Sequence, residues 1–366
     1  MKPAIEIMQE RAANATRELL ARSPSGSVRA VFAGGSVGRG EVWSHLDGTA
    51  LTIYSDLDLY VVLAENADHD AVRRAAATVA GAMPSEQDGV VFKRGVDVGV
   101  YPLDDLLAQP IRPGTVDVFE RHFWLHGDPS IMDRLREAPA RPMASTEALY
   151  LLENRAWDAL DVMASAGRAA SATAAKVVLD VLTAHLIGEG RFRPTYAARR
   201  DQLSERAPSA LAAGDLELIA AAERVRAGDY SRPLPPLAAL DAVARAWCTL
   251  APAILGVASG SPPADLVALR CRRGAVVENY REFVRLRRRV GLSLASAVVR
   301  GWRYASLSPR SALRTHALVR GLAETARVTP VDVAFHERYV ARVAWQLRAR
   351  ENTLDERARA ALRMVS

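Results

Sequence analysis

Three acidic side chains on strand-like segments are the residues in this chain best suited to chemistry. Asp56 and Asp58 flank Leu57, and Asp97 follows on a later apolar segment. Because side chains alternate along a strand, Asp56 and Asp58 point from the same face. Adjacent carboxylates repel one another unless a cation lies between them, and these hard oxygen ligands suit magnesium. If the strand of Asp97 neighbours the first, the spacing predicts a site that can hold two ions.

A glycine–serine pair precedes these acids in the chain. Gly35 and Ser36 follow the apolar segment 28–33, and small residues there let backbone amides approach a phosphate closely. Residues 34–38 also match the Gly-x-Ser-x-Gly elbow of α/β-hydrolases. That elbow needs a sheet already built around it, but Ser36 lies too near the N-terminus, and the elbow leaves the aspartate pair unexplained. No Gly-Lys-Ser/Thr follows, which excludes a Walker phosphate loop. The pattern favours phosphate binding.

The elements that must position these residues alternate between strand and helix over the first 140 residues. Apolar alternation predicts strands, helical composition predicts a connecting helix, and an amphipathic helix is expected at the N-terminus. The expected strands are 28–33, 55–63, 90–101 and 122–125, and the expected helices are 1–23 and 67–83. The fold class is therefore α+β, with a small mixed sheet followed by an all-helical region.

Beyond Met143 the strand signals stop and helical spacing continues. The expected helices are 148–166, 174–187, 211–226 and 237–255. A stretch rich in glycine, serine and proline, 256–263, is a candidate boundary. We therefore expect three regions: a catalytic domain with its N-terminal helix at 1–140, a helical domain closing the active-site cleft at 141–258, and a basic helical region at 264–366.

The order of the motifs resembles the DNA-polymerase-β-like nucleotidyltransferase superfamily. Its pattern is an apolar strand, Gly-Ser, a short connection, acid-apolar-acid on a strand, and a third acid on another strand. The Gly-Ser-Val-Gly-Arg-Gly-Glu stretch at 35–41 and Ser-Asp-Leu-Asp-Leu at 55–59 look especially like the bacterial branch. That branch contains aminoglycoside nucleotidyltransferases and the adenylyltransferase of glutamine synthetase. The resemblance covers about residues 28–128. It departs in the longer connection between Ser36 and Asp56, where Trp43–Ile53 would be an insertion.

The resemblance implies a role for each motif residue that binds the nucleotide. Ser36 and the amide of Gly35 would hold the β- and γ-phosphates, and Arg39 would neutralise them. The nucleotide expected from the bacterial branch is ATP. Attack on its α-phosphate would release pyrophosphate and leave AMP on a hydroxyl of the acceptor, which the resemblance favours as a small molecule.

The resemblance also implies a role for each of the acids. Asp56 and Asp58 would bind two magnesium ions, and Asp97 would bind the catalytic ion and accept the proton of the acceptor hydroxyl. Asp104 and Asp105 are alternatives for the third acid. They follow Tyr101-Pro102, where acids are favoured for capping a helix, so Asp97 is preferred.

Charge is unevenly distributed and leaves a second class of acceptor open. Residues 1–137 carry 14 basic and 20 acidic side chains, whereas residues 265–350 carry 18 basic and 6 acidic. An arginine-rich C-terminal region attracts polyanions, so RNA or a protein acceptor remains an alternative, as does a non-catalytic nucleotide-binding protein on the same fold. Lys176 and a cluster of arginines are candidates for lining the nucleotide or acceptor pocket; the cluster comprises Arg191, Arg193, Arg199 and Arg200.

Composition bounds the location of the protein. Cys248 and Cys271 are the only cysteines and have no metal-ligand spacing, which fits a reducing cytoplasm. Apolar stretches such as Val177–Ile187 are short and interrupted by polar residues, so we expect no membrane-spanning helix and no membrane partner.

Overall fold

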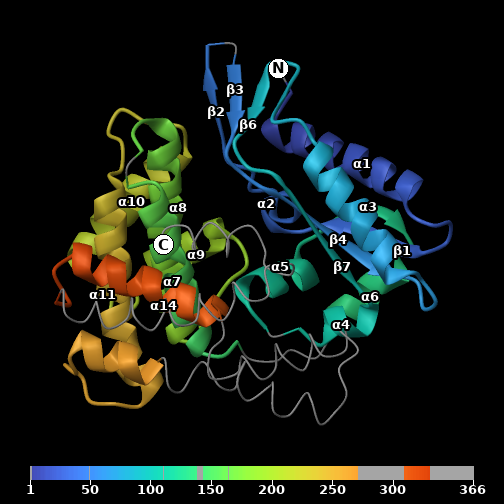
Figure 1. The fold of residues 1–366 in the computed structure, drawn as a ribbon. Coiled ribbons are helices and arrows are strands. Elements are labelled where there is room, and N and C mark those ends of the chain that lie inside the picture. The colour runs from blue at the N-terminus through green and yellow to red at the C-terminus, as the bar shows by residue number, and fades with distance from the viewer. Residues whose placement is uncertain are drawn as a thin grey trace, which may run out of the picture. The chain divides into compact units, whose positions relative to one another are not determined.

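The computed structural model describes residues 2–48, 50–109, 111–137, 143–163, 165–270 and 309–329. Within them the fold is α+β, as the sequence predicts, with two small mixed sheets and many helices (Figure 1). The chain divides into two compact units, and each unit collects separate stretches of sequence. The N-terminal unit comprises Met1–Ala144, Glu189–Pro208 and Glu223–Ser231. The helical unit comprises Ser145–Gly188, Ser209–Ala222 and Arg232–Ser366.

The sheet that carries Asp58 and Asp97 has four strands in the order β7-β4-β1-β8. Its strands are β1 (Val28–Ala33), β4 (Leu57–Leu63), β7 (Val96–Tyr101) and β8 (Phe123–Gly127). Strand β1 runs antiparallel to both β4 and β8, whereas β4 and β7 are parallel. The sequence predicts a strand signal at each of the four, with apolar alternation in β4 and β7. The parallel pair requires a crossover, which the chain makes through the predicted helix α3 (His69–Ala82).

The chain between Ser36 and Asp56 contains a β-hairpin. Its strands are β2 (Ser44–Asp47) and β3 (Ala50–Ile53), and β3 also pairs in parallel with β6 (Val90–Phe92). A two-residue strand, β5 (Glu86–Gln87), completes this second sheet. The strand signal expected over 90–101 is confirmed, but it corresponds to two strands, β6 and β7. Lys93, Arg94 and Gly95 interrupt it, so β6 and β7 enter different sheets.

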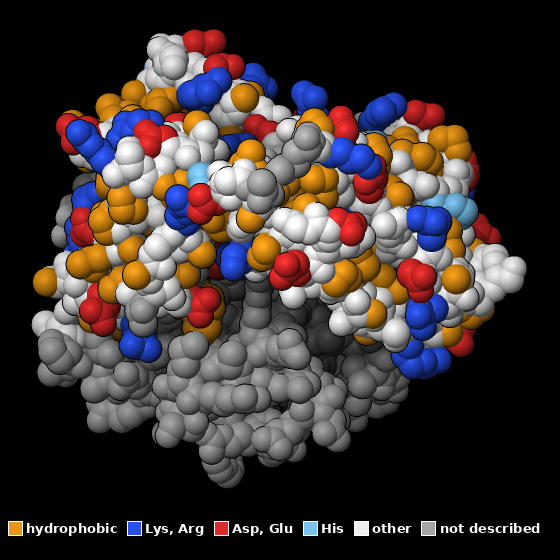
Figure 2. Space-filling view, turned by 90° about the horizontal axis from the view of Figure 1, so that it is seen from above, with side chains coloured by type: hydrophobic (Ala, Val, Ile, Leu, Met, Phe, Trp, Pro, Cys, Tyr) orange, Lys and Arg blue, Asp and Glu red, His pale blue; other side chains and the backbone are white. Residues whose placement is uncertain are grey.

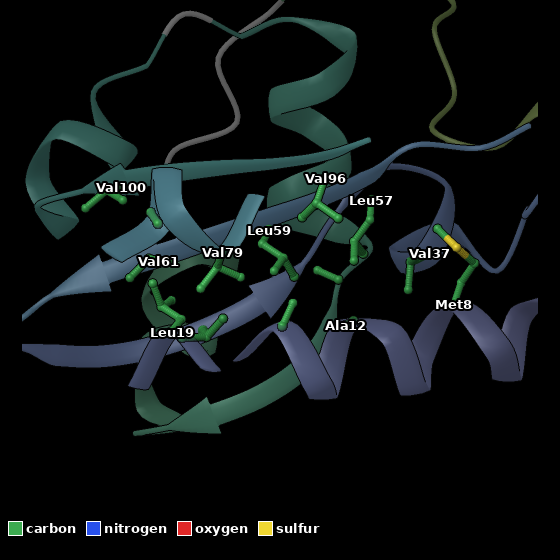
Figure 3. Packing of buried hydrophobic residues seen from close by; sticks show 14 of the residues in the cluster. Met8, Ala12, Leu19, Val37, Leu57, Leu59, Val61, Val79, Val96 and Val100 are labelled. Carbon is green, nitrogen blue, oxygen red and sulfur yellow. The ribbon is translucent and has the colours of Figure 1, made fainter. Parts of the chain in front are cut away.

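Helices cover both faces of the β7-β4-β1-β8 sheet. One face packs against α1 (Ala4–Arg22), α3 and the short α2 (Gly35–Arg39). Figure 3 shows Met8, Ala12 and Leu19 of α1 facing Leu57, Leu59 and Val61 of β4. Fully burying an aliphatic side chain of this size contributes about 1.5–3 kcal/mol, so this layer supplies much of the stability of the N-terminal unit.

The other face carries a smaller apolar cluster under three short helices. These are α4 (Leu103–Leu107), α5 (Pro113–Glu120) and α6 (Ser130–Arg136). The cluster includes Phe32 of β1 and Val62 of β4. Because Val62 continues the row of Asp58 and Tyr60, Asp58 and its cross-strand partner Asp97 lie on this second face.

Helical spacing correctly predicts four helices: α7 (Thr146–Asp161), α8 (Arg168–Gly188), α10 (Ala213–Arg226) and α11 (Pro236–Leu255). A further helix, α14 (Pro309–Glu324), lies in the C-terminal region. Gly256, with a φ of +66°, ends α11 where the sequence places a boundary. A buried ion pair joins Arg270 to Glu153 of α7, with the Nε–Oε1 distance at 2.8 Å.

The membrane expectation needs a correction. Helices α8 and α11 are both long and apolar enough to cross a membrane. In α8, alanine and threonine residues extend the helix well beyond the short stretch Val177–Ile187. In α8, however, 89% of the most apolar window is buried inside the protein, and in α11 50% is buried. The burial of α8 is that of a core helix in a soluble protein.

The two units also differ from the contiguous regions expected at 1–140, 141–258 and 264–366. The first boundary lies close to Ala144, but 189–208 and 223–231 return to the N-terminal unit. They do so because Glu41 binds the start of α9 (Tyr196–Glu205) and His45 packs on Tyr230. Of the basic region, the described residues 264–270 and 309–329 belong to the helical unit; the remainder, including most of its arginines, lies outside the described residues.

Candidate active site

The structure brings the predicted acids onto neighbouring strands. Asp58 of β4 is in register with Asp97 of β7, so their side chains lie side by side on the same face of the parallel pair. Neighbouring strands are about 4.8 Å apart. Asp56 lies one residue before β4 begins, outside the strand, so strand alternation does not fix the face of its side chain as the sequence predicts. Asp97 is exposed, and Asp56 and Asp58 are half-buried. The expected adjacency of the two acid-bearing strands is confirmed.

Register also separates Asp97 from the alternative acids. Asp104 and Asp105 lie in the first turn of α4, as the capping argument predicts, and outside the sheet. Asp104 is exposed and lies 3.8 Å from Arg134 of α6. Only Asp97 of the three is paired with Asp58 across the strands.

The glycine–serine turn is fastened directly to the acid-bearing strand. The amide of Gly34 donates to the carbonyl of Asp58 (3.0 Å), and the hydroxyl of Ser36 donates to the carbonyl of Asp56 (3.3 Å). Gly35 has a φ of +55°, and a Cβ on it would lie 2.1 Å from Oδ2 of Asp58. The backbone of Gly35 therefore touches a carboxylate that any larger residue would displace. The tight turn at Gly34 and Gly35 and the start of α2 therefore pack closely against Asp58 of β4.

The same geometry weighs against a hydrolase elbow. In that motif the serine hydroxyl stands exposed at the top of the sheet. Here Ser36 is 7% exposed and its hydroxyl is bound to a backbone carbonyl. Ser36 is placed to orient the turn and not to attack a substrate.

Arg39 and Glu41 form a charged cluster at the end of the glycine–serine turn. Nε of Arg39 lies 3.3 Å from Oε2 of Glu41, and the guanidinium of Arg226 lies 3.7 Å from the same oxygen. Both arginines also lie over the ring of Tyr196, at 5.8 and 4.4 Å from its centroid. Arg39 is thus held in place by an acid and a ring, whether or not a phosphate is near it. The sequence pointed to Arg39 but missed Glu41, Tyr196 and Arg226, because no local pattern links residues so far apart.

A row of stacked aromatic rings lies next to the acids on the same face. Trp124, Phe32, Tyr60 and Tyr101 come from the four strands in spatial order, with centroids 6.4, 5.5 and 6.2 Å apart. A Cβ on Gly99 would lie 2.4 Å from the ring of Tyr101, so this glycine lets the ring fold back onto Tyr60. The row stiffens the sheet beneath the acids. Alternation with Asp58 marks Tyr60 in the sequence, whereas the contribution of Gly99 has no sequence signal.

Burial changes the protonation of a histidine beside this row. His122 lies edge-on to Phe32 at 5.7 Å, and its Nδ1 is 3.0 Å from the carbonyl of Val118. Burial lowers the pKa of His122, which keeps the imidazole neutral near pH 7.

The basic residues proposed for the pocket divide into two groups. Arg191 and Arg199 have structural contacts: Arg191 binds Glu189 and the carbonyls of Gln202 and Arg206, whereas Arg199 is buried and binds the carbonyls of Arg193 and Pro194. The side chains of Arg193 and Arg200 are exposed. Lys176 lies half-buried on α8, in the helical unit. Its part in nucleotide binding stays a prediction.

The acids suit magnesium only together with further ligands. Among the residues that the structure describes, no group of three or more His, Cys, Asp or Glu side chains is close enough to form a metal cluster by itself. Asp58 and Asp97 nevertheless present hard oxygens side by side. Magnesium commonly binds one or two carboxylates and takes its remaining ligands from water and substrate phosphates. The donor set therefore fits an ion that arrives with a triphosphate.

Comparison with known proteins adds no further support. The sequence matches no family model, and no curated protein matches it either. The interpretation of this face therefore depends on the geometry of the acids and the turn.

Proposed function

We propose that the protein is a magnesium-dependent nucleotidyltransferase that transfers AMP from ATP to a hydroxyl of a small-molecule acceptor in the cytoplasm. One observation carries the proposal: Asp58 and Asp97 are in register on parallel strands, while the backbone of Gly35 lies against Asp58. The glycine–serine turn, to which we assign phosphate binding, therefore lies directly beside paired carboxylates.

Each residue of the face has a task in the proposed reaction. The turn at Gly35 and Ser36 binds the β- and γ-phosphates through backbone amides. Asp56, Asp58 and Asp97 would hold magnesium, which when bound would neutralise charge on the phosphate oxygens and on the leaving pyrophosphate. Asp97 is the most exposed of the acids and accepts the proton of the acceptor hydroxyl as that oxygen bonds to the α-phosphorus. The bond to the bridging oxygen breaks, and pyrophosphate leaves.

The experiment that tests the proposal labels acceptors with nucleotides carrying a radioactive α-phosphate. Purified protein is incubated with magnesium and labelled ATP, GTP, CTP or UTP and with pools of small molecules, RNA or protein. We expect label from ATP in the small-molecule pool, and none with Asp58→Asn. Binding of ATP and magnesium by the wild type without labelling of any pool would instead favour a non-catalytic nucleotide-binding protein.

An RNA acceptor is the second candidate, and the basic C-terminal region favours it. On the face shown in Figure 2, the coloured basic and acidic side chains are interspersed, and no large patch carries one sign. The arginine-rich residues 271–308 lie outside the described residues. Binding to bulk tRNA distinguishes the two acceptors, because affinity for a polyanion falls steeply with salt. Weak binding at all salt concentrations favours the small molecule.

A further inference from the structure

Glu41 connects the phosphate-binding turn to a helix more than 150 residues further along the chain. Its Oε2 accepts from the amide of Tyr196 (3.1 Å) and its Oε1 from the amide of Ala197 (3.2 Å). These are the first two amides of α9, which no carbonyl within the helix can satisfy. Thr195 caps the next amide, that of Ala198 (3.1 Å). The amides at the start of α9 are therefore already bound by Glu41 and Thr195, so they do not serve as a second anion site.

The same carboxylate gathers positive charge around the turn. Arg39 lies within the turn itself, and Arg226 reaches Glu41 from the end of α10. The side chains of Glu41, Arg39 and Arg226 are 12%, 13% and 18% exposed, so water screens these pairs only partly. One carboxylate thus fixes two guanidinium groups and two helix amides.

The backbone carries this constraint to the acids. The amide of Glu41 donates to the carbonyl of Ser36 (2.9 Å), and the hydroxyl of Ser36 donates to the carbonyl of Asp56 (3.3 Å). A shift of Glu41 relative to α9 therefore moves Ser36 relative to Asp56. The contacts form a continuous path from the first turn of α9 to the acid-bearing strand.

From this path we infer that Glu41 is a positioning residue, which sets the Gly35–Arg39 turn for nucleotide binding by anchoring it to α9. The inference rests on the proposed function. Without Glu41, the turn stays attached to β4 but loses its second anchor, and Arg39 loses the acid that orients it. Triphosphate affinity then falls although no group that touches the nucleotide has been removed.

The test compares Glu41→Gln with Glu189→Gln. Both changes remove the charge of a partly buried glutamate that pairs with an arginine in the N-terminal unit, but Glu189 pairs with Arg191, which binds carbonyls at the end of α9 and not at its start. Isothermal titration with ATP and magnesium gives both the dissociation constant and the binding stoichiometry. Hydrogen exchange reports on the amides of Tyr196 and Ala197.

For Glu41→Gln we expect about tenfold weaker ATP binding at unchanged stoichiometry, a size typical of coupling between sites. Exchange at Tyr196 and Ala197 should become faster, and Glu189→Gln should bind ATP as the wild type does. A purely structural role would instead reduce the stoichiometry and leave the dissociation constant of the remaining folded protein unchanged, which overturns the inference.

A second variant and the wild type keep the outcomes distinct. Arg226→Gln removes one guanidinium partner and leaves both helix amides bound to Glu41, so we expect a smaller loss of ATP affinity in the same direction. This variant decides the question if Glu41→Gln does not fold, and unchanged affinity then overturns the inference. Failure of the wild type to bind ATP with magnesium would overturn the proposed function and this inference together. Wild-type affinity in Glu41→Gln would overturn only the inference.

Discussion

The two faces of strand β4 show how one short segment serves both stability and chemistry. Leu57, Leu59 and Val61 are at most 1% exposed and pack under α1 and α3. Asp58 and Tyr60 alternate with them and are half-buried on the opposite face. The apolar face follows the rule that buried side chains are apolar. The acidic face departs from it, because neighbouring like charges destabilise a sheet. Such a departure is expected where a site binds a ligand.

The largest expected effect separates the chemistry of one face from the stability of the other. Asp58→Asn should lower transfer of labelled AMP about a thousandfold, the upper range for removing one group that stabilises developing charge. The thermal midpoint should stay equal or rise, because the repulsion with Asp97 is relieved. Asp105→Asn is the matched control, since this acid lies in α4 outside the sheet. Equal activity of both variants would refute the assignment.

Leu59→Ala tests the opposite face of the same strand. This change should lower the free energy of unfolding by about 2–5 kcal/mol, the range for a large-to-small substitution in a core. Chemical denaturation measures the loss. The folded fraction should bind ATP with wild-type affinity, because no group of the acidic face has changed. A specific loss of affinity would show that the two faces are not separable in this way.

Gly35→Ala tests the contact between the turn and the acid. A positive φ costs a non-glycine residue about 1–3 kcal/mol, and here the new methyl group also pushes against Asp58. Gly40→Ala is the control, since Gly40 has a φ of +72° and open space around its Cα. Both variants should lose stability, but only Gly35→Ala should lose ATP affinity. Equal affinities in the two variants would argue against a close fit at Asp58.

The smallest effect concerns an acid at the edge of the Glu41 cluster. Burial raises the pKa of Glu223 above its ordinary value of 4.5; Arg226 and Arg200 lower it, and Glu41 raises it. The folded protein therefore holds this proton more tightly than the unfolded chain, so stability falls as pH rises through the folded pKa. Glu223→Gln should raise the thermal midpoint near pH 7, and the gain should shrink as the pH is lowered towards 4.5. A constant difference across this range would contradict the shift.

Local patterns predict what depends on local spacing. Alternation along 55–63 gives β4 and the face that carries Asp58, and helical spacing gives α8 and α11. The pairing of Asp58 with Asp97 was expected only on the condition that their strands are neighbours, which is a matter of topology. The anchoring of Glu41 by Tyr196 has no local signal at all, since it depends on a distant segment returning to the N-terminal unit. The start of α8 was expected at 174 but lies at Arg168, because the first residues of the helix are small or polar and give little apolar periodicity.

The most direct test of the magnesium and triphosphate site uses Mn²⁺ as a probe that electron paramagnetic resonance detects. Free Mn²⁺ is titrated with protein in the presence and absence of ATP. The proposed site predicts that wild-type protein and ATP together deplete the free Mn²⁺ signal beyond the depletion by ATP alone. It also predicts that Asp58→Asn and Asp97→Asn abolish this additional binding, whereas Asp105→Asn retains it. Equal depletion by all four proteins would contradict the assignment of this face as the active site.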